Sequence, residues 1–344
     1  MKKLLLFGSN SIHTYNYFQI IKDFFDDILL VTDKPAGICD SIPKLVVNYS
    51  FRHPLNILNI ISTTRKIIDD YQPSIIHLHQ IDTRAFCALK ALKKRDIPVV
   101  VTAWGSDVLI NPKRNWVLRK MVRYILENGT YFTADSRCVS SEMRKLTKKE
   151  LNITIANFGV DIEMNDCEKE NIIFSNRLHE PLYRIDKIVY AFKRFVENHP
   201  DWKLIIAAEG SETPKLKKLV QSLNLNDSIS FVGWLDKSQN AHYYSISKYW
   251  ISIPESDGVS ISLLEAMSMN GIPIVSALPA KYEWILHNIN GFLVDDIDSD
   301  FISEAMNIPK ELAMAVNKRI IAEKATKSIN KEKFISIYRK ILMN

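Results

Sequence analysis

The segment from Lys248 to Asp295 alternates strand-like and helix-like patterns, and this alternation constrains the fold more than any other feature of the chain. Tyr249–Ile253 is an aromatic and β-branched run of the kind that forms a buried strand. The residues 260–270 then place apolar side chains at helical spacing, and a glycine stops that helix. A strand over 272–276, a loop, a second helix and a last strand complete the predicted pattern.

The same alternation continues through both halves of the 344-residue chain, which is long for a single core. It predicts an α/β fold of two doubly wound, Rossmann-like domains with parallel sheets. We expect domains at 1–162 and 171–325, and an apolar-faced helix at 326–344 that returns to the first domain. Strands are predicted at 3–9, 28–32, 44–48, 75–78, 99–103, 131–134, 172–175, 203–207 and 229–232, and helices at 15–25, 55–71, 84–95, 116–128, 185–198, 214–223, 238–246 and 330–344.

Composition is that of an ordinary globular protein, with 47% hydrophobic and 24% charged residues. The N-terminal lysines and leucines imitate a signal peptide, but their apolar run ends at Gly8, which indicates a first strand. Apolar stretches long enough to cross a bilayer are absent from the sequence. The cysteines are far apart and predict neither zinc nor disulfides, so we expect a cytoplasmic protein; they are Cys39, Cys87, Cys138 and Cys167.

Charge is distributed unevenly, with a net charge of +9 for residues 1–160 and −3 for the remainder. The excess lies in two clusters, Lys90, Lys93, Lys94 and Arg95, and then Lys113, Arg114, Arg119, Lys120 and Arg123. They could contact an anionic membrane surface or a pyrophosphate-bearing acceptor, or could simply form solvated helix faces. Nucleic acid is disfavoured because aromatic residues are not interleaved with these charges.

The turn that follows Ile253 carries a candidate anion site. A glycine and small residues at a strand-to-helix turn leave backbone N–H groups unpaired, with the helix dipole behind them. Asp257 and Glu265 flank this turn with seven residues between them, and carboxylates there would suit the hydroxyl groups of sugars. In the alternative interpretation, Ser262 to Glu265 form a capping box and Glu265 folds back onto a backbone N–H.

Polar residues also follow the strands predicted in the first half. The loop from Gly8 to His13 is not a GxGxxG sequence, so a nicotinamide-binding fingerprint is absent. His77 and His79 lie on one face of their strand, where a buried structural histidine is the alternative to a functional one. Trp104–Asp107 follows another strand.

The segment SDGVSISLLEAMSMNGIPIVS, with Glu283 and the NGFLV sequence at 290–294, resembles the family-4 retaining glycosyltransferases of GT-B fold. Members of that family have an acid, seven residues and a glutamate at the donor site. The first acid is commonly glutamate, whereas this chain has Asp257. WGSD at 104–107 is similar to a subset of the family. The resemblance covers nearly the whole chain, strongly over 172–295 and weakly over 1–130.

The resemblance implies a donor site in the second domain. Arg177 would face the diphosphate, Glu265 would bind the ribose, Asp257 would contact the sugar, and these three would be the catalytic set. The family's lysine falls near Tyr183, so Arg184 or Lys187 would have to compensate; Trp234 would lie against the base, unless it is an ordinary core residue. The donor-binding set is Gly8, Arg177, Arg184, Gly233, Trp234, Leu235, Asp257, Gly258, Val259, Ser260, Ser262, Leu263 and Glu265.

On the acceptor side the resemblance implies that His13, His79, Trp104 and Asp107 line the first domain's strand ends. Many members have a histidine where this chain has Trp104, so the role of that histidine cannot be transferred. Asp107 is then the polar group of most interest.

The expected activity is retaining transfer of a sugar from a UDP- or GDP-linked donor, without metal or other cofactor. The acceptor would be a glycan or lipid-linked molecule in surface-polysaccharide assembly, such as lipopolysaccharide or capsule, with the enzyme cytoplasmic or peripheral at the inner face of a membrane. A nucleotide-sugar epimerase of GT-B fold and a degenerate nucleotide-binding protein are the alternatives. Activity without any acceptor would indicate the first, and binding without sugar release the second.

Overall fold

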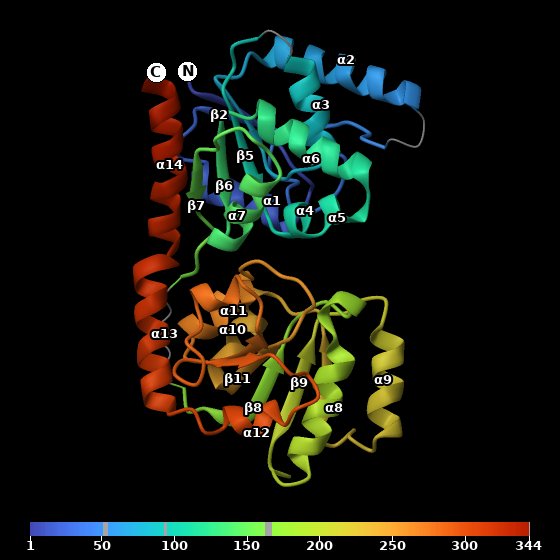
Figure 1. The fold of residues 1–344 in the computed structure, drawn as a ribbon, viewed down its shortest axis with the longest axis vertical. Coiled ribbons are helices and arrows are strands. Elements are labelled where there is room, and N and C mark those ends of the chain that lie inside the picture. The colour runs from blue at the N-terminus through green and yellow to red at the C-terminus, as the bar shows by residue number, and fades with distance from the viewer. Residues whose placement is uncertain (51–53, 93–94, 162–166, 344) are drawn as a thin grey trace. The chain divides into compact units, whose positions relative to one another are not determined.

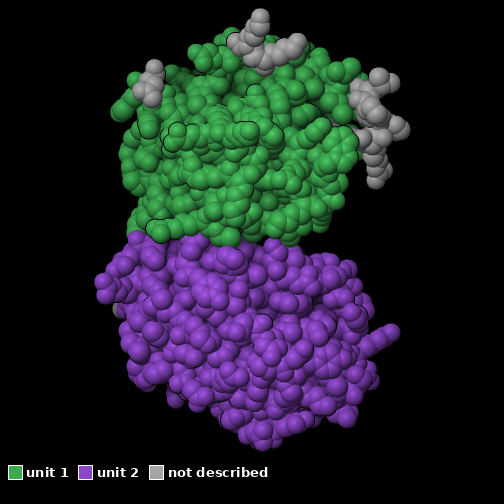
Figure 2. All heavy atoms as spheres, viewed as in Figure 1, with its two compact units in different colours: residues 1–158, 327–344 green, residues 159–326 purple. Residues whose placement is uncertain are grey.

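The computed structural model describes residues 1–50, 54–92, 95–161 and 167–343, and Lys93 and Lys94 of the first basic cluster lie outside these ranges. The chain divides into two compact units, which Figure 2 colours separately. Unit 1 comprises residues 1–158 and 327–344, and unit 2 comprises residues 159–326. Each unit is built around one parallel sheet, as the alternating sequence pattern predicted.

Within the described residues, unit 1 forms a seven-stranded parallel sheet in the order β3-β2-β1-β4-β5-β6-β7. Strand β1 was predicted from the apolar run at the N-terminus, and four of its five residues are buried. Strand β7 is short and was not predicted. The bounds are β1 Lys3–Phe7, β2 Asp27–Thr32, β3 Lys44–Val46, β4 Ile75–Leu78, β5 Val99–Ala103, β6 Tyr131–Ala134 and β7 Ile153–Ile155.

Helices α6 and α7 of unit 1 begin where a side chain satisfies an N–H group of the first turn. The Asn115 side chain accepts a hydrogen bond from the Leu118 N–H at the start of α6, and Ser136 accepts one from the Val139 N–H at the start of α7. Helix α7 was not predicted. The bounds are α1 Ile12–Ile21, α2 Pro54–Tyr71, α3 Thr83–Leu92, α4 Ser106–Leu109, α5 Asn111–Arg114, α6 Trp116–Asn128, α7 Arg137–Lys145 and α14 Lys327–Met343.

Unit 2 forms a six-stranded parallel sheet in the order β10-β9-β8-β11-β12-β13, again counting described residues. Its strands are β8 Glu170–Ser175, β9 Lys203–Ala207, β10 Ile229–Gly233, β11 Ser247–Ser252, β12 Ile272–Ser276 and β13 Phe292–Val294. Its helices are α8 Ile185–Val196, α9 Thr213–Ser222, α10 Lys237–Ile246, α11 Ile261–Ser268, α12 Phe301–Ala305 and α13 Lys310–Lys324, with 3₁₀ turns η1 Pro181–Tyr183 and η2 Lys281–Glu283.

Alternation along the strands of unit 2 divides its core between the two faces of the sheet. Ile173 and Tyr249 belong to the hydrophobic cluster that includes α8 and α12, whereas Phe174 and Trp250 belong to the cluster that includes α11. Because successive side chains of a strand point to opposite faces, a strand buried on both sides must be apolar throughout. The sheet is therefore fixed on both faces, and its strand ends hold loops in place.

Helix α14, red in Figure 1, belongs to unit 1 although it follows unit 2 in the sequence. Phe334 packs edge-on against Tyr17 of α1 with ring centroids 5.2 Å apart, and Tyr338 packs against Phe25 at 4.9 Å. This return to the first unit was predicted. Leu342 was placed on the same buried face, but it is 39% exposed.

The second helix predicted between β12 and β13 is wrong, because only the 3₁₀ turn η2 forms among the described residues there. The Asn290 side chain accepts from the Leu286 N–H at 2.6 Å and donates to the Trp284 carbonyl at 2.9 Å. Such side-chain bonds replace helical backbone bonds. Asn288 also has a left-handed backbone conformation, with φ of 61°.

The helices of the described chain are each too short or too polar to span a bilayer.

Candidate functional site

The carboxyl ends of β8 and β11 carry the polar side chains of unit 2. Asn176, directly after β8, donates to Asn240 at 2.9 Å and to the Tyr244 hydroxyl at 2.7 Å, and accepts from the Trp250 indole N–H at 3.0 Å. These bonds fix the start of the loop that carries Arg177. In an open parallel sheet, this edge is where ligands bind.

Helix α11 begins after the loop Glu255–Ser260, as the sequence predicted. Its N-cap is Ser260, whose hydroxyl accepts a hydrogen bond from the Leu263 N–H at 3.4 Å. Ser262 therefore lies inside the helix, and the capping box proposed for Ser262 and Glu265 does not form. Gly258, Val259 and Ser260 supply the backbone at this turn, and all three residues are buried.

Glu265 lies within α11, and one of its carboxylate oxygens accepts a hydrogen bond from the Tyr244 hydroxyl at 3.0 Å. Burial, together with the nearby Glu265 charge, raises the pKa of Tyr244 well above its ordinary value, so the hydroxyl keeps its proton. The carboxylate thus already receives a hydroxyl donor in this structure. This is the chemistry required of a group that binds sugar hydroxyls.

Asp257 forms the centre of an ionic cluster at the same edge of the sheet. The Lys281 Nζ donates to its Oδ2 at 2.9 Å, and the Arg177 Nη2 lies 3.4 Å from the same oxygen. Burial pushes the pKa of Asp257 upward, but Lys281 and Arg177 more than offset this, and the pKa lies below its ordinary value. Asp257 is therefore ionised. Sequence reasoning missed Lys281, because no motif marks it.

Two neighbours of Arg177 differ in role from the sequence expectation. The Tyr183 ring lies beneath the Arg177 guanidinium, 4.6 Å from ring centroid to Cζ. Arg184 was predicted to face the diphosphate, but its Nε donates to the Ile253 carbonyl at 2.7 Å and its Nη2 to the Pro254 carbonyl at 2.9 Å. Arg184 therefore holds the end of β11, where the Pro254 carbonyl also accepts a hydrogen bond from the Ser276 hydroxyl at 2.7 Å.

The loop after β10 presents Trp234 to solvent. Its side chain is 65% exposed, so the alternative of ordinary core packing is wrong. Gly233 has φ of 69°, a backbone conformation that side chains disfavour, and Leu235 is partly buried against the neighbouring core. An exposed tryptophan on a tightly turned loop is available to a flat ligand such as a base.

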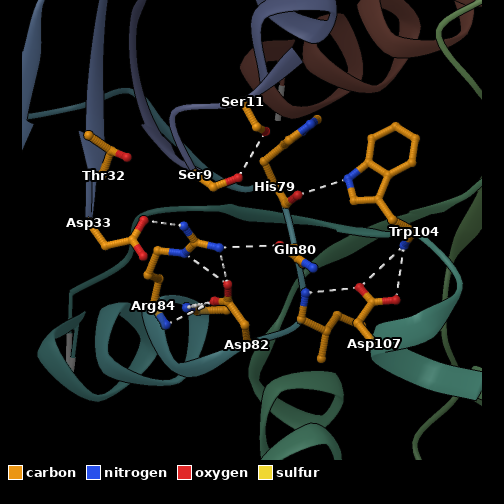
Figure 3. A network of polar contacts seen from close by, with 12 residues as sticks. Ser9, Ser11, Thr32, Asp33, His79, Gln80, Asp82, Arg84, Trp104 and Asp107 are labelled. Carbon is orange, nitrogen blue, oxygen red and sulfur yellow. Dashed lines mark hydrogen bonds and ion pairs between the residues drawn. The ribbon is translucent and has the colours of Figure 1, made fainter. Parts of the chain in front are cut away.

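Aromatic rings gather at the strand ends of unit 1. Trp104 stacks on Phe158 with centroids 4.3 Å apart, and His13 stacks on the same ring at 5.8 Å. The Trp104 indole N–H donates to the His79 carbonyl at 2.8 Å (Figure 3). Gly8 lies at the turn after β1, where a Cβ would lie 2.8 Å from the Thr14 hydroxyl oxygen, so a larger residue would displace the Thr14 side chain.

His77 in β4 and His79, the residue directly after this strand, have different surroundings. His77 is fully buried and bonded through Nδ1 to the Tyr17 hydroxyl at 2.8 Å and through Nε2 to the Thr102 hydroxyl at 2.7 Å, so it is structural. His79 is 3% exposed, and neither of its ring nitrogens has a hydrogen-bond partner within the described part of the chain. Burial lowers the pKa of His79 well below its ordinary value, so the imidazole is neutral.

Asp107 is fully buried, although it was expected to line the acceptor side. Its carboxylate accepts from the Ile81 N–H at 3.1 Å and from the Trp104 N–H at 3.1 Å (Figure 3). Burial raises the pKa of Asp107 to about 7, against the lowering effect of these backbone bonds. Asp107 therefore ties two loops together and positions Trp104, and it offers no exposed surface to an acceptor.

An ionic cluster that the sequence did not indicate lies beside these residues. Figure 3 shows the Arg84 guanidinium between Asp33 and Asp82. Its Nη1 donates to Asp33 at 2.8 Å, its Nε donates to Asp82 at 2.8 Å, and its Nη2 contacts the Gln80 amide oxygen at 3.2 Å. Arg84 is thus already occupied by two carboxylates. Nowhere in the described chain do three or more His, Cys, Asp and Glu side chains gather as a metal site.

Two family models match the chain. One described as Glycosyl transferases group 1 matches residues 162–326, and one described as Glycosyl transferase 4-like matches residues 3–136. N-acetyl-alpha-D-glucosaminyl L-malate synthase of Bacillus anthracis is 25% identical over 315 residues, 85% of this chain and 80% of that protein. Lipopolysaccharide 1,6-galactosyltransferase of Escherichia coli K12 is 26% identical, over 66% of this chain and 63% of that protein.

Solved structures share the whole fold at low identity. HepE of Anabaena, crystallised with UDP, has a TM-score of 0.81 at 14% identity, covering 99% of this chain and all of that one. A glycosyltransferase from Rickettsia africae has a TM-score of 0.82 at 18% identity, covering all of this chain and 99% of that one. These matches confirm the predicted fold of two Rossmann-like units.

Proposed function

This chain is a glycosyltransferase of the GT4 type with the GT-B fold, and we propose that it moves a sugar from a nucleoside-diphosphate donor to a glycan or lipid-linked acceptor with retention of configuration. The cluster of Arg177, Lys281 and Asp257 beside the start of α11 is the observation that carries this proposal. Cations and helix N-terminal amides together favour a diphosphate.

In the proposed site, Arg177 and the backbone at Gly258 to Ser260 stabilise the negative charge that develops on the departing diphosphate. Glu265 binds the ribose hydroxyls, and Asp257 contacts the transferred sugar. Ser262, Leu263 and the Gly233–Leu235 loop complete the donor side, with Trp234 against the base. The printed titles of the HepE structures name UDP and UDP-glucose as ligands of that protein, which makes UDP the first nucleotide to test here.

The proposed mechanism is a front-face attack that needs no metal or other cofactor. Asp257 and Glu265 belong to one turn and helix of unit 2, so they are not the opposed pair of acids that a glycosidase uses. A phosphate oxygen of the donor would take the proton of the acceptor hydroxyl. His13, His79 and Trp104 would form the acceptor side, with Asp107 holding Trp104 in place.

For the acceptor we propose a component of surface-polysaccharide assembly, with the enzyme cytoplasmic and peripheral at a membrane. Supporting this, helices α5 and α6 present Trp116, 69% exposed, and Val117 among exposed cations. The Lys120 ammonium lies 4.7 Å from the centroid of the Trp116 ring. Exposed aromatic and basic side chains on one segment favour the interface of an anionic bilayer.

Thermal shift against UDP, GDP, ADP, CMP and NAD tests the donor proposal. A ligand that binds the folded state raises the midpoint by linkage. We expect a clear shift with one nucleoside diphosphate and none with NAD. A folded sample that shifts with none of the five would contradict the proposal.

Flotation with phosphatidylglycerol and with phosphatidylcholine vesicles tests the membrane proposal. We expect binding to the anionic vesicles and its loss in the double variant Trp116→Ser/Lys120→Ser. The matched control is Lys215→Ser/Lys218→Ser on α9, which removes two exposed lysines from unit 2. Equal flotation of both double variants would contradict the proposal that α5 and α6 form the membrane-binding surface.

A further inference from the structure

Lys281 is a lysine in an unusual position, with a side chain that is fully buried in the turn after β12. Its ammonium donates to Asp257 Oδ2 at 2.9 Å and to the Gly258 carbonyl at 2.8 Å. Removing a charge from water is expensive, so a buried ammonium persists only with close partners of this kind. The loop between β11 and α11 provides both partners.

The charges of this cluster answer a difficulty that the sequence alone raises. A carboxylate beside a diphosphate would repel it, because like charges at such distances interact strongly. Here Asp257 is shared by Lys281 and Arg177, at 2.9 and 3.4 Å from one oxygen. The three side chains sum to a charge of +1, which suits an anion.

The hydrogen bond to Gly258 adds an orienting effect. A peptide unit is planar, so holding the Gly258 carbonyl oxygen also fixes the direction of the Val259 N–H, which points the opposite way. Lys281 thus fixes the peptide that leads into α11 as well as the carboxylate that precedes it. Both belong to the proposed donor site.

The cation that the family resemblance placed near Tyr183 is missing, and Arg184 donates to backbone carbonyls instead. We propose that Lys281 supplies this second positive charge from the β12 side, as a positioning residue that neutralises Asp257 and so permits a nucleoside diphosphate to bind. This inference rests on the proposed donor function of unit 2. It assigns a role to a residue outside the motif of an acid, seven residues and a glutamate.

Titration calorimetry with UDP and with uridine tests the role, because uridine lacks the diphosphate. Lys281→Met leaves the cluster with no net charge, and we expect UDP to bind on the order of tenfold or more weakly while uridine is unaffected. Asp257→Asn/Lys281→Met restores the net charge of +1, so UDP affinity should return to within about threefold of wild type. UDP has no sugar, so losing the proposed sugar contact of Asp257 does not disturb this comparison.

Lys248→Met is the matched control, since Lys248 is a half-buried lysine in β11 at the opposite end of that strand. It should leave the preference for UDP over uridine unchanged. If Lys281→Met does not fold, Asp257→Asn alone decides, because raising the net charge to +2 should tighten UDP binding.

An Asp257→Asn protein with unaltered UDP affinity, a Lys281→Met protein that binds UDP like wild type, or a double variant as weak as the single one would overturn the role of Lys281. Wild-type protein that binds neither UDP nor GDP would instead refute the donor function on which it rests.

Discussion

Asp107 of α4 in unit 1 is fully buried and the Asp257 side chain in unit 2 is 17% exposed. Both carboxylates follow the end of a parallel strand, yet their charges are handled in opposite ways. Asp107 is bonded to backbone N–H groups, and burial raises its pKa to about 7. Asp257 contacts Lys281 and Arg177, which bring its pKa below the ordinary value despite burial. Near pH 7 the first acid is therefore only about half ionised, whereas the second is fully charged.

The two units also differ in how many acids each cation contacts. Arg84 of unit 1 is divided between Asp33 and Asp82, whereas Arg177 and Lys281 of unit 2 converge on one acid. Two sheets of similar topology therefore present strand ends with an excess of acid in one unit and of cation in the other. The fold provides the edge, and the pairing of charges determines which edge can hold an anion.

The pH dependence of stability gives the largest expected effect, about 4 kcal/mol if the pKa of Asp107 moves from 3.8 to about 7 on folding. Because the folded state holds this proton more tightly, the free energy of unfolding should fall as pH rises from about 4 to about 7 and then level off. Asp107→Asn should lack this decrease. Urea unfolding of the wild type and of Asp107→Asn across that pH range measures this decrease. If the free energy of unfolding depends on pH equally in both proteins, the contrast drawn between Asp107 and Asp257 is wrong.

Asp257 should affect the pH dependence of stability with the opposite sign. Its pKa is lowered in the folded state, so the stability it contributes is lost as pH falls below the ordinary pKa of an aspartate.

The largest effect on binding is expected at Arg177, the arginine that contacts Asp257. Arg177→Ala should weaken UDP binding about a hundredfold, or about 3 kcal/mol, because a charged donor to the diphosphate is lost. Calorimetry measures this, with Arg194→Ala as the control because its guanidinium binds the Ser299 carbonyl at 2.8 Å. Equal affinities of the two variants would remove Arg177 from the site.

Arg84→Met should separate stability from binding. It leaves Asp33 and Asp82 without their cation, and we expect a loss of about 2 kcal/mol in the free energy of unfolding at unchanged UDP affinity. The control is Arg95→Met, whose partner Asp69 lies in a more exposed pair and should cost about 0.5 kcal/mol or less. Weakened UDP binding in Arg84→Met would show that the acidic edge is not independent of the donor site.

Glu265→Gln should give the smallest effect, about tenfold in UDP affinity through weaker hydrogen bonds to the ribose. The wild-type protein should prefer UDP to its 2′,3′-dideoxy form, and the variant should bind the two alike. Competition between the two nucleotides measures this preference directly. A variant that keeps the full preference would place the ribose elsewhere.

The order of strands and helices could be predicted because strands of a covered parallel sheet contain continuous apolar runs, as at Tyr249–Ile251 and Val99–Val101. The second helix before β13 failed because Asn290 bonds to the backbone, a competition that apolar periodicity does not reveal. Strand β7 has only three residues, too few to show an alternation, and the mostly polar α7 buries only Val139, Ser140 and Met143.

The candidate site could be predicted only where residues are close in sequence. Glu265 and Asp257 were found by their spacing, but Lys281 meets Asp257 across 24 residues and a whole strand. Arg84 and Asp33 meet across 51 residues. Asp107 was expected to face an acceptor because it follows a strand end. The sequence does not reveal that its carboxylate instead accepts hydrogen bonds from backbone N–H groups.

The packing of α14 on α1 makes unit 1 a discontinuous domain, with the whole of unit 2 inserted in its sequence. Unit 2 is synthesised completely before Phe334 and Tyr338, the residues whose rings pack against Tyr17 and Phe25. Domains fold as units once their chain is available, so the insert can fold before the unit that surrounds it. Residues 1–158 are thus translated before unit 2, yet the unit to which they belong is completed after it.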